Sequence, residues 1–323
     1  MTAGGVRAAF GLPPGTLTAD PVARGLQGVV HRFDADDGSR WAVKIALSPP
    51  AGPEVAFSAA FEEAAASAGI PAPGVRRTVD GQVLATIAGH TVRVAPWVDL
   101  QGPDIGLDPA SVGQLLARLH AVPERASFSS KGIGVHSWYC QPVGGVAWDA
   151  HIRRCRRLGA PFAERLSGHR DVLVDLERLL APPDRLQTCH RDLFADNVRG
   201  TAAGGVCVVD FDNAGPAAPS QELAFVLVEF GTDASGVVDA ARCHSLLEAY
   251  AAAGGPGRLT GPGAFSMVIA VLGHLVELGV EHWCDATEDP AIASADLAGP
   301  QAMVLGVLDR PFTLDVVHGL LSA

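Results

Sequence analysis

The chain has 323 residues, of which 48% are hydrophobic and 18% are charged, and its formal net charge at pH 7 is −11. This length accommodates one large or two modest domains, and the composition excludes a disordered or low-complexity protein. The acidic balance argues against nucleic acid as a partner, because binding to a phosphate backbone requires clustered Lys and Arg. The first residues lack a signal-peptide pattern, so we expect no export and a cytoplasmic location.

The front of the chain predicts a small sheet. Residues 21–47 contain two apolar runs joined by a hairpin turn rich in Asp and Gly. Gly28 opens the first run, and a glycine near a turn is explained by backbone freedom alone. Lys44 lies in the middle of the second run, between apolar neighbours. A strand lysine usually faces solvent, so Lys44 by itself indicates no function.

A helix and two more strands complete this first lobe. Residues 54–69 carry apolar side chains at helical spacing and end at a glycine, and residues 83–87 and 91–98 predict strands. We therefore predict an N-lobe, residues 1–98, with a small sheet and one helix. The segment from Ala95 to Trp97 would link it to the rest of the chain.

From residue 108 onward the pattern becomes helical, which predicts a larger, mainly helical C-lobe over residues 99–323. The expected fold class is therefore α+β with two lobes. The most apolar run, residues 265–280, falls short of the roughly 20 residues that cross a bilayer. We interpret this run as a buried helix and expect no membrane partner.

One stretch within the C-lobe indicates chemistry. Residues 190–197 read His-Arg-Asp-Leu-Phe-Ala-Asp-Asn, which matches the catalytic-loop pattern of kinases. In that pattern Asp192 is the base and Asn197 is a ligand of Mg²⁺. A short β-branched run then ends at Asp210, which supplies a second carboxylate. A hairpin would bring these three side chains together, so we predict a phosphoryl-transfer centre that uses ATP or GTP.

This loop changes the interpretation of the N-lobe residues. Lys44 would reach the α and β phosphates of the nucleotide, and the backbone at Gly28 would lie over them. The segment from Ala95 to Trp97 would bond and sandwich the adenine ring. A glutamate of the predicted helix should pair with Lys44. The candidates are Glu54, Glu62 and Glu63, of which Glu54 and Glu62 share one side of the helix, and we choose Glu54.

Two neighbours of the catalytic residues have expected supporting roles. His190 would orient the loop through hydrogen bonds, since Asp192 already fills the role of base. Asp212 would either support a second metal ion or cap the turn before Gly215, and the sequence leaves both alternatives open.

With these motifs the chain resembles the aminoglycoside phosphotransferase family, in the wider group that includes choline and homoserine kinases and shares the protein-kinase fold. The resemblance covers most of residues 22–283. Its implied roles are catalytic base for Asp192, Mg²⁺ ligands for Asn197 and Asp210, and phosphate binding for Lys44. The Glu222-Leu-Ala element is similar to one that braces the catalytic loop in this family.

The chain departs from the family in its predicted helix, where the glutamate usually lies nearer to Ser58 or Ala59. The length of one connection limits the class of acceptor molecule. Only eleven residues lie between Asp210 and Glu222. That is too few for the activation segment on which a peptide docks. We therefore expect a small-molecule acceptor, an aminoglycoside or another antibiotic. The alternatives are a metabolite kinase and a catalytically silent nucleotide-binding scaffold.

The wall of the acceptor pocket is expected among the C-lobe helices. Carboxylates and an aromatic ring there would suit ammonium groups or a sugar face, although charged helix ends are often merely solvated. The candidate residues are Glu229, Glu281, Trp283 and Asp285. The oligomeric state is not readable from the sequence.

Overall fold

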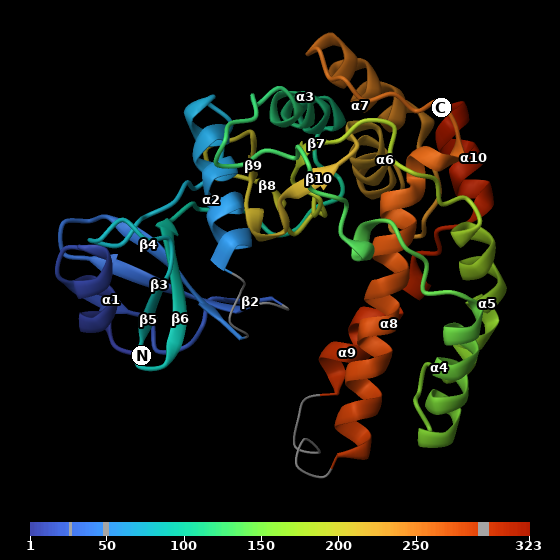
Figure 1. Ribbon diagram of the computed structural model, residues 1–323, viewed down its shortest axis with the longest axis horizontal. Coiled ribbons are helices and arrows are strands. Elements are labelled where there is room, and N and C mark those ends of the chain that lie inside the picture. Colours follow the sequence, from blue (N-terminus) through green and yellow to red (C-terminus); the bar gives the residue numbers. More distant parts are fainter. Residues whose placement is uncertain (26–27, 48–51, 290–296) are drawn as a thin grey trace. The chain divides into compact units, whose positions relative to one another are not determined.

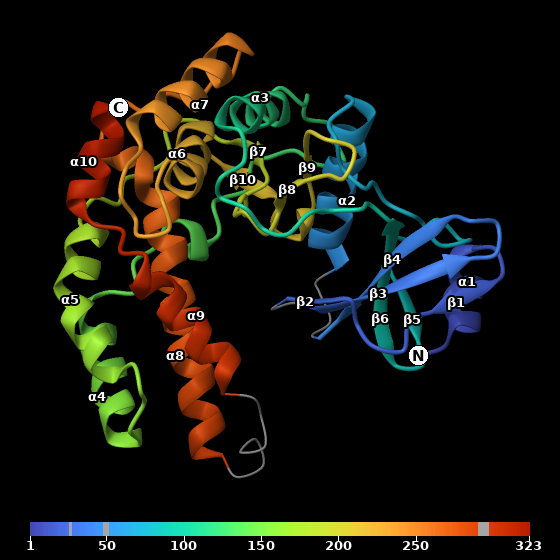
Figure 2. The same ribbon diagram turned by 180° about the vertical axis from the view of Figure 1, so that it is seen from behind.

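The computed structural model describes residues 1–25, 28–47, 52–289 and 297–323. The chain divides into two compact units, which are shown together in Figures 1 and 2 and are described here one at a time. Unit 1 comprises residues 1–104, 122–129 and 196–215, and unit 2 comprises residues 105–121, 130–195 and 216–323. The lobe boundary at residue 98 stays a prediction. Residues 26 and 27, in the expected loop before the first strand, lie outside the described residues.

An antiparallel sheet with the order β1-β3-β4-β6-β5 forms the centre of unit 1, and β2 also pairs with β3. The strands are β1 Gly15–Leu17, β2 Ala23–Arg24, β3 Gly28–Ala35, β4 Arg40–Ala46, β5 Ala85–Ile87 and β6 His90–Pro96. Strand β4 is central, with β3 on one side and β6 on the other. Lys44 therefore lies in the middle of the sheet, as the apolar run around it predicted.

One face of this sheet is covered by helix α1, Ala3–Phe10, which the sequence analysis did not predict. Its buried side chains Val6 and Phe10 pack with Phe33 and Val43 of the sheet. The helix has only eight residues and carries two glycines, so its helical pattern is weak. Thr2 caps its N-terminus, and Gly11 ends it in the left-handed conformation.

Helix α2, Gly52–Ser67, and a short hairpin complete unit 1. The hairpin strands are β8, Val198–Gly200, and β9, Val206–Val208, and a 3₁₀ turn, η2, follows at Phe211–Asn213. Phe61 of α2 packs on Phe211, with ring centroids 5.7 Å apart. This contact fixes the helix against the residues that follow β9.

Unit 2 is mainly helical, with α3 and α7 side by side in both views of the ribbon (Figures 1 and 2). A two-stranded sheet joins β7, Gln187–Cys189, to β10, Gly215–Ala217. The helices are α3 Pro109–His120, α4 Gly145–Leu158, α5 Ala163–Glu177, α6 Pro219–Phe230, α7 Ala240–Ala252, α8 Ser266–Glu288, α9 Ala298–Asp309 and α10 Leu314–Ser322. The mixed α+β composition confirms the predicted fold class.

Helix α8 is longer than expected. The predicted run ended at residue 280, but the helix continues to Glu288, and the stretch Pro262–Glu288 is long and apolar enough to cross a membrane by length and composition. Within the most apolar window, 61% of the residues are buried inside the protein. A core helix passes the same test, so the length argument was wrong and only burial supports a core role.

The packing of α3 on α7 yields a prediction about Gly113. A Cβ at this position would lie 2.3 Å from the Leu246 backbone oxygen of α7, so an added methyl group must push the two helices apart. We expect Gly113→Ala to lower the free energy of unfolding by about 1–3 kcal/mol, measured by denaturant titration. The matched control is Gly168→Ala in α5, where open space surrounds the new Cβ and alanine favours the helix. Equal stabilities of the two variants would contradict the packing argument.

Candidate active site

The hairpin of unit 1 brings two predicted metal ligands to one end. Val198 of β8 is opposite Val208 of β9, and the next backbone bond joins Val209 N to Asn197 O at 2.9 Å. Asn197 and Asp210 are thus neighbours across the open end of the hairpin. Asp210 has left-handed backbone angles, φ 58° and ψ 64°, at the start of the turn η2. A non-glycine residue in this region is uncommon and frequently marks a functional position.

Lys44 is held by both carboxylates that flank this turn. Its Nζ lies 2.7 Å from Asp210 Oδ1 and 2.7 Å from Asp212 Oδ2, although these residues are distant in sequence. Burial alone would lower the pKa of Lys44, but the two aspartates outweigh it and raise that pKa. The lysine therefore stays charged and points at Asp210 and Asp212, and the solvent-facing alternative does not apply.

A second cation, which the sequence analysis missed, lies beside Lys44. Arg93 of β6 is the direct cross-strand neighbour of Lys44, and its guanidinium bonds both Asp212 and Glu62 of helix α2. The Arg93 and Glu62 side chains are only 12% and 5% exposed. The sequence held one signal for this pair, an arginine placed between valines in an apolar strand.

The choice of Glu54 as partner of Lys44 is corrected by these contacts. Glu54 is exposed in the first turn of α2, whereas Glu62, two helical turns later, is buried. Glu62 bonds Arg93, and the ion-pair partners of Lys44 in the described structure are Asp210 and Asp212. The error arose because helical spacing gives the side of a helix but not which end of it contacts the sheet.

Burial and neighbouring charge act in opposite directions on the two acids bonded to Arg93. Burial raises the pKa of Glu62 to about 7; Arg93 opposes this shift, and the negative charges of Asp212 and Asp210 reinforce it. Burial also disfavours ionised Asp212, but Lys44 and Arg93 outweigh it and lower the pKa of that carboxyl. Asp212 therefore remains charged, while Glu62 titrates close to neutral pH.

The other predicted nucleotide contacts have structural partners of their own. A Cβ on Gly28 would lie 2.6 Å from Ile45 O, so strand pairing already explains this glycine. The Trp97 backbone N donates to Arg40 O at 2.9 Å, and its indole Nε1 donates to Asp99 Oδ1 at 2.9 Å. Ala95 continues β6 opposite Ala42. Their adenine and phosphate contacts stay predictions.

Unit 2 holds the catalytic loop by two acids of helix α6. Glu222, fully buried, accepts from the Arg191 backbone N and from His120 Nε2, the latter at 2.8 Å. These bonds outweigh burial and lower the pKa of Glu222. His120 Nδ1 is 2.8 Å from the Tyr250 hydroxyl, which accepts from Gly257 N. Glu222 therefore bonds the backbone directly before Asp192, in agreement with the bracing role that the family resemblance implied.

Glu229 is the second acid that bonds this loop. It lies two helical turns after Glu222, on the same side of α6. Its Oε1 accepts from the Ala195 backbone N at 3.0 Å, and its Oε2 pairs with Arg310 at 2.7 Å. Asp192 thus lies between two backbone groups that α6 holds. Both carboxylate oxygens of Glu229 are engaged within the protein, which differs from its predicted role in acceptor binding.

The other three residues predicted to bind the acceptor differ in their exposure to solvent. Trp283 is buried and packs its ring on Phe162 in the helical core, so the expected ligand contact is replaced by core packing. Asp285 pairs with Arg154 at 2.6 Å. Glu281 is exposed, and its carboxylate lies within 4.8 Å of ligand atoms of His151 and Glu277. Glu281 and Asp285 are therefore accessible from solvent, whereas Trp283 is not.

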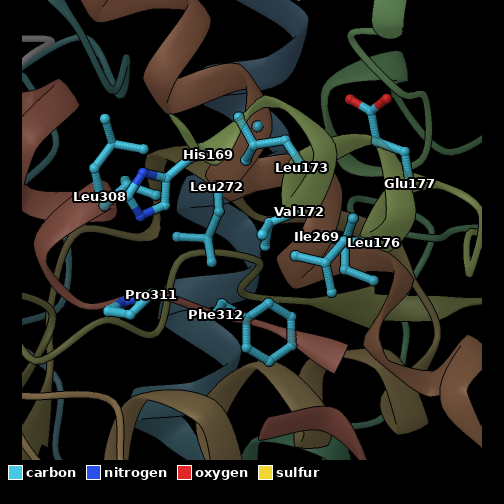
Figure 3. Close-up of a pocket in the computed structure, with 12 residues that line it drawn as sticks. His169, Val172, Leu173, Leu176, Glu177, Ile269, Leu272, Leu308, Pro311 and Phe312 are labelled. Carbon is cyan, nitrogen blue, oxygen red and sulfur yellow. The ribbon is translucent and has the colours of Figure 1, made fainter. Parts of the chain in front are cut away.

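A pocket in unit 2 lies among α5, α8 and α9 (Figure 3). Its lining is mostly apolar and includes Val172, Leu176, Ile269, Leu308 and Phe312. None of the predicted site residues lines it. The pocket is consequently distinct from the acidic acceptor wall that the sequence analysis expected.

Comparison with known proteins identifies the family. The sequence profile of the phosphotransferase enzyme family matches residues 18–258, which is most of the chain. The chain belongs to the phosphotransferase enzyme family. This membership confirms the resemblance inferred from the catalytic loop.

Curated relatives include a homoserine kinase from Pseudomonas aeruginosa, which is 29% identical over 187 residues. The match covers 57% of this chain and 56% of the relative, so the chain spans about half the length of the curated relatives it matches.

Two solved structures have the same fold over nearly the whole chain. A spectinomycin phosphotransferase, solved with ADP and spectinomycin, has a TM-score of 0.65 at 12% identity and covers 98% of this chain and 96% of its own. An amicoumacin kinase, solved with AMP-PNP and Ca²⁺, has a TM-score of 0.56 at 15% identity, with 98% and 95% covered. These likenesses confirm the predicted protein-kinase-like α+β fold.

The raised pKa of Glu62 generates a stability prediction. In the unfolded chain the carboxyl titrates near its ordinary value, so between about pH 4.5 and about pH 7 the folded state binds the additional proton. Stability from this group is therefore present below the unfolded pKa and is lost as the pH rises towards 7. We expect wild-type stability relative to Glu62→Gln to fall by about 3 kcal/mol over this range, measured by urea unfolding. Glu63→Gln, which removes an exposed carboxylate from the same helix, is the control, and a pH-independent difference would refute the assignment.

Proposed function

We propose that this protein transfers the terminal phosphoryl group of ATP or GTP to a hydroxyl of an aminoglycoside or another small antibiotic. The observation that carries the proposal is the ion pair between Lys44 Nζ and Asp210 Oδ1, 2.7 Å long. It joins the predicted phosphate-binding lysine to the predicted metal-binding carboxylate across 166 residues of sequence. A phosphate-binding cation beside a metal-binding carboxylate suits a kinase site, because phosphoryl transfer depends on placed charges rather than on covalent catalysis.

Each residue of the motif would have one role. The Asp192 carboxylate accepts the proton of the acceptor hydroxyl, whose oxygen forms a bond to the terminal phosphorus while the bond from that phosphorus to the bridging oxygen breaks. Lys44 neutralises charge on the nucleotide phosphates. Asp192 then releases its proton to solvent, so the enzyme returns to its starting state.

The donor set of the hairpin fits Mg²⁺. Asn197 offers an amide oxygen and Asp210 a carboxylate, and hard oxygen ligands are those that Mg²⁺ prefers. Asp212 would support this arm, while its two oxygens bond Lys44 and Arg93. When bound, the ion would supply positive charge that offsets the negative charge of the nucleotide phosphates.

Two observations support a small antibiotic as the acceptor: the short connection after Asp210 and the similarity to known phosphotransferases. Eleven residues separate Asp210 from Glu222, and they form the turn η2, the strand β10 and the start of α6. No length remains there for a peptide-docking segment, which favours a small molecule. The neighbouring structures include a spectinomycin phosphotransferase, and this supports an antibiotic as acceptor. Because such donors and acceptors meet inside the cell, we expect a cytoplasmic enzyme.

A metabolite kinase is the second candidate. The curated relatives named homoserine kinase support it, since their similarity extends over 187 residues at 29% identity. The acceptor decides between the two, because one scaffold hosts many substrates and specificity resides in the pocket. A silent scaffold is the remaining alternative, and the complete set of Asp192, Asn197, Asp210 and Lys44 argues against it.

Phosphoryl transfer is tested with aminoglycosides, other hydroxyl-bearing antibiotics, homoserine and choline as acceptors. We expect a nucleotide-dependent mass gain of about 80 Da on one of them, which is one phosphoryl group. Phosphorylation of homoserine alone would favour the metabolite kinase. Nucleotide binding without transfer to any acceptor would favour the scaffold.

Site variants test the assigned roles with the acceptor so found. We expect Asp192→Asn to lower kcat by about 10²–10⁴-fold, because the amide cannot take the hydroxyl proton. Asp210→Ala should abolish Mg²⁺-dependent turnover, and Lys44→Met should weaken nucleotide binding and lower the rate. Asp196→Asn, an exposed neighbour in the same loop, serves as the control. Full activity in any of the first three variants would contradict its role.

A further inference from the structure

Two cations face the same carboxylate in unit 1, and this arrangement has no counterpart in the sequence motifs. Lys44 and Arg93 are directly opposite each other on β4 and β6. Side chains in such a pair lie on the same face, about 5 Å apart at Cβ, and like charges there repel. Asp212 relieves the repulsion, since its Oδ2 bonds Lys44 and its Oδ1 bonds Arg93.

Glu62 adds a second carboxylate to Arg93 alone. A planar guanidinium has donors for two carboxylates at once, whereas an ammonium is a compact point charge. In kinases the strand lysine and a glutamate of the following helix form one pair. Here the helix glutamate pairs with the arginine of the next strand, so Lys44 makes no bond to α2 among the described residues.

This division of partners affects what Lys44 can do. The two acids that bond Lys44 are Asp210 and Asp212, which follow β9 at the proposed Mg²⁺ site. Arg93 competes with Lys44 for Asp212 and so weakens the hold of that carboxylate on the ammonium. Without Arg93, Asp212 would have Lys44 as its one cationic partner in this cluster, and the ammonium would be less available to an incoming phosphate.

We propose that Arg93 is a positioning residue that holds Glu62 and shares Asp212 with Lys44, and that this sharing weakens the hold of Asp212 on Lys44 so that the lysine can bind the phosphates of the nucleotide. The inference rests on the proposed function, because it assumes a nucleotide at Lys44. In this proposal the ion pair between Arg93 and Glu62 fixes helix α2. Lys44 binds the phosphoryl donor.

The test measures the affinity for Mg²⁺ and ADP by titration calorimetry, with no acceptor present. Arg93→Met alone would leave Glu62 buried without its partner and risks unfolding, so every variant is built on Glu62→Gln. On this background we expect Arg93→Met to raise the Kd for ADP about tenfold, towards the value of Lys44→Met. Folding of each variant is checked by circular dichroism and thermal unfolding.

Asp212→Asn supplies the decisive comparison. If Arg93 acts by holding Asp212, the Asp212→Asn substitution alone already frees Lys44. Adding Arg93→Met to Asp212→Asn should then change the Kd for ADP by less than about threefold. If Arg93 instead contacts the phosphates itself, the tenfold loss persists in the Asp212→Asn background and overturns the proposal. An unchanged Kd for Arg93→Met on the Glu62→Gln background also overturns it.

A matched pair on the same helix is the control for general ion-pair loss. Arg77 bonds Glu63 of α2 through two nitrogens, but both side chains are more than a third exposed and neither contacts Asp212. We expect Arg77→Met to leave the Kd unchanged. Failure of the wild type to bind ADP would contradict the proposed function, whereas binding that is indifferent to Arg93 contradicts only this inference.

Discussion

The shared carboxylate of Asp212 is the interaction on which the organisation of unit 1 depends. Two positively charged side chains on adjacent strands cannot be buried together without an anion between them. Asp212 provides this anion from the turn after β9, and Glu62 provides another from α2. The sheet, the helix and the hairpin are therefore tied to one cluster of charges, and the packing of Phe61 on Phe211 supports the same arrangement.

The charges of this cluster do not balance. Three carboxylates, Glu62, Asp210 and Asp212, surround two cations, Lys44 and Arg93. Burial of an uncompensated negative charge is unfavourable, and the raised pKa of Glu62 is one response to it. Binding of a divalent cation by Asp210 would be a second response to the excess negative charge. The same imbalance that weakens the folded protein at higher pH would thus favour uptake of a metal ion.

In unit 2 the backbone around Asp192 is positioned by helix α6. Glu222 bonds the backbone before Asp192, and Glu229, two helical turns later on the same side of α6, bonds the backbone after it. Each acid is itself held by a cation or an imidazole, Arg310 for Glu229 and His120 for Glu222. The backbone on both sides of Asp192 is thereby fixed, which favours the precise placement that the proposed role of this residue would require.

The sequence by itself determined the family of this protein and the candidate residues of its site. The spacing of Asp192, Asn197 and Asp210 is local, since one loop and one hairpin carry all three, and short-range patterns are readable from the chain. The same holds for the apolar run around Lys44 and for the helical pattern that begins at residue 108. The assignment to a kinase-type family followed from these segments alone, and the family profile confirmed it.

Only the tertiary structure decided which charges meet. The two ion-pair partners of Lys44 are 166 and 168 residues away in the sequence. Glu62 of α2 bonds Arg93 rather than Lys44, and Arg93 belongs to no sequence motif. Glu229 and Trp283, expected to contact the acceptor, are engaged in a loop brace and in the helical core. Helical spacing tells which residues share a side, but the end of a helix that contacts the sheet depends on packing between distant segments. For that reason the catalytic motif was legible in the chain, while the ion pairs that orient it were not.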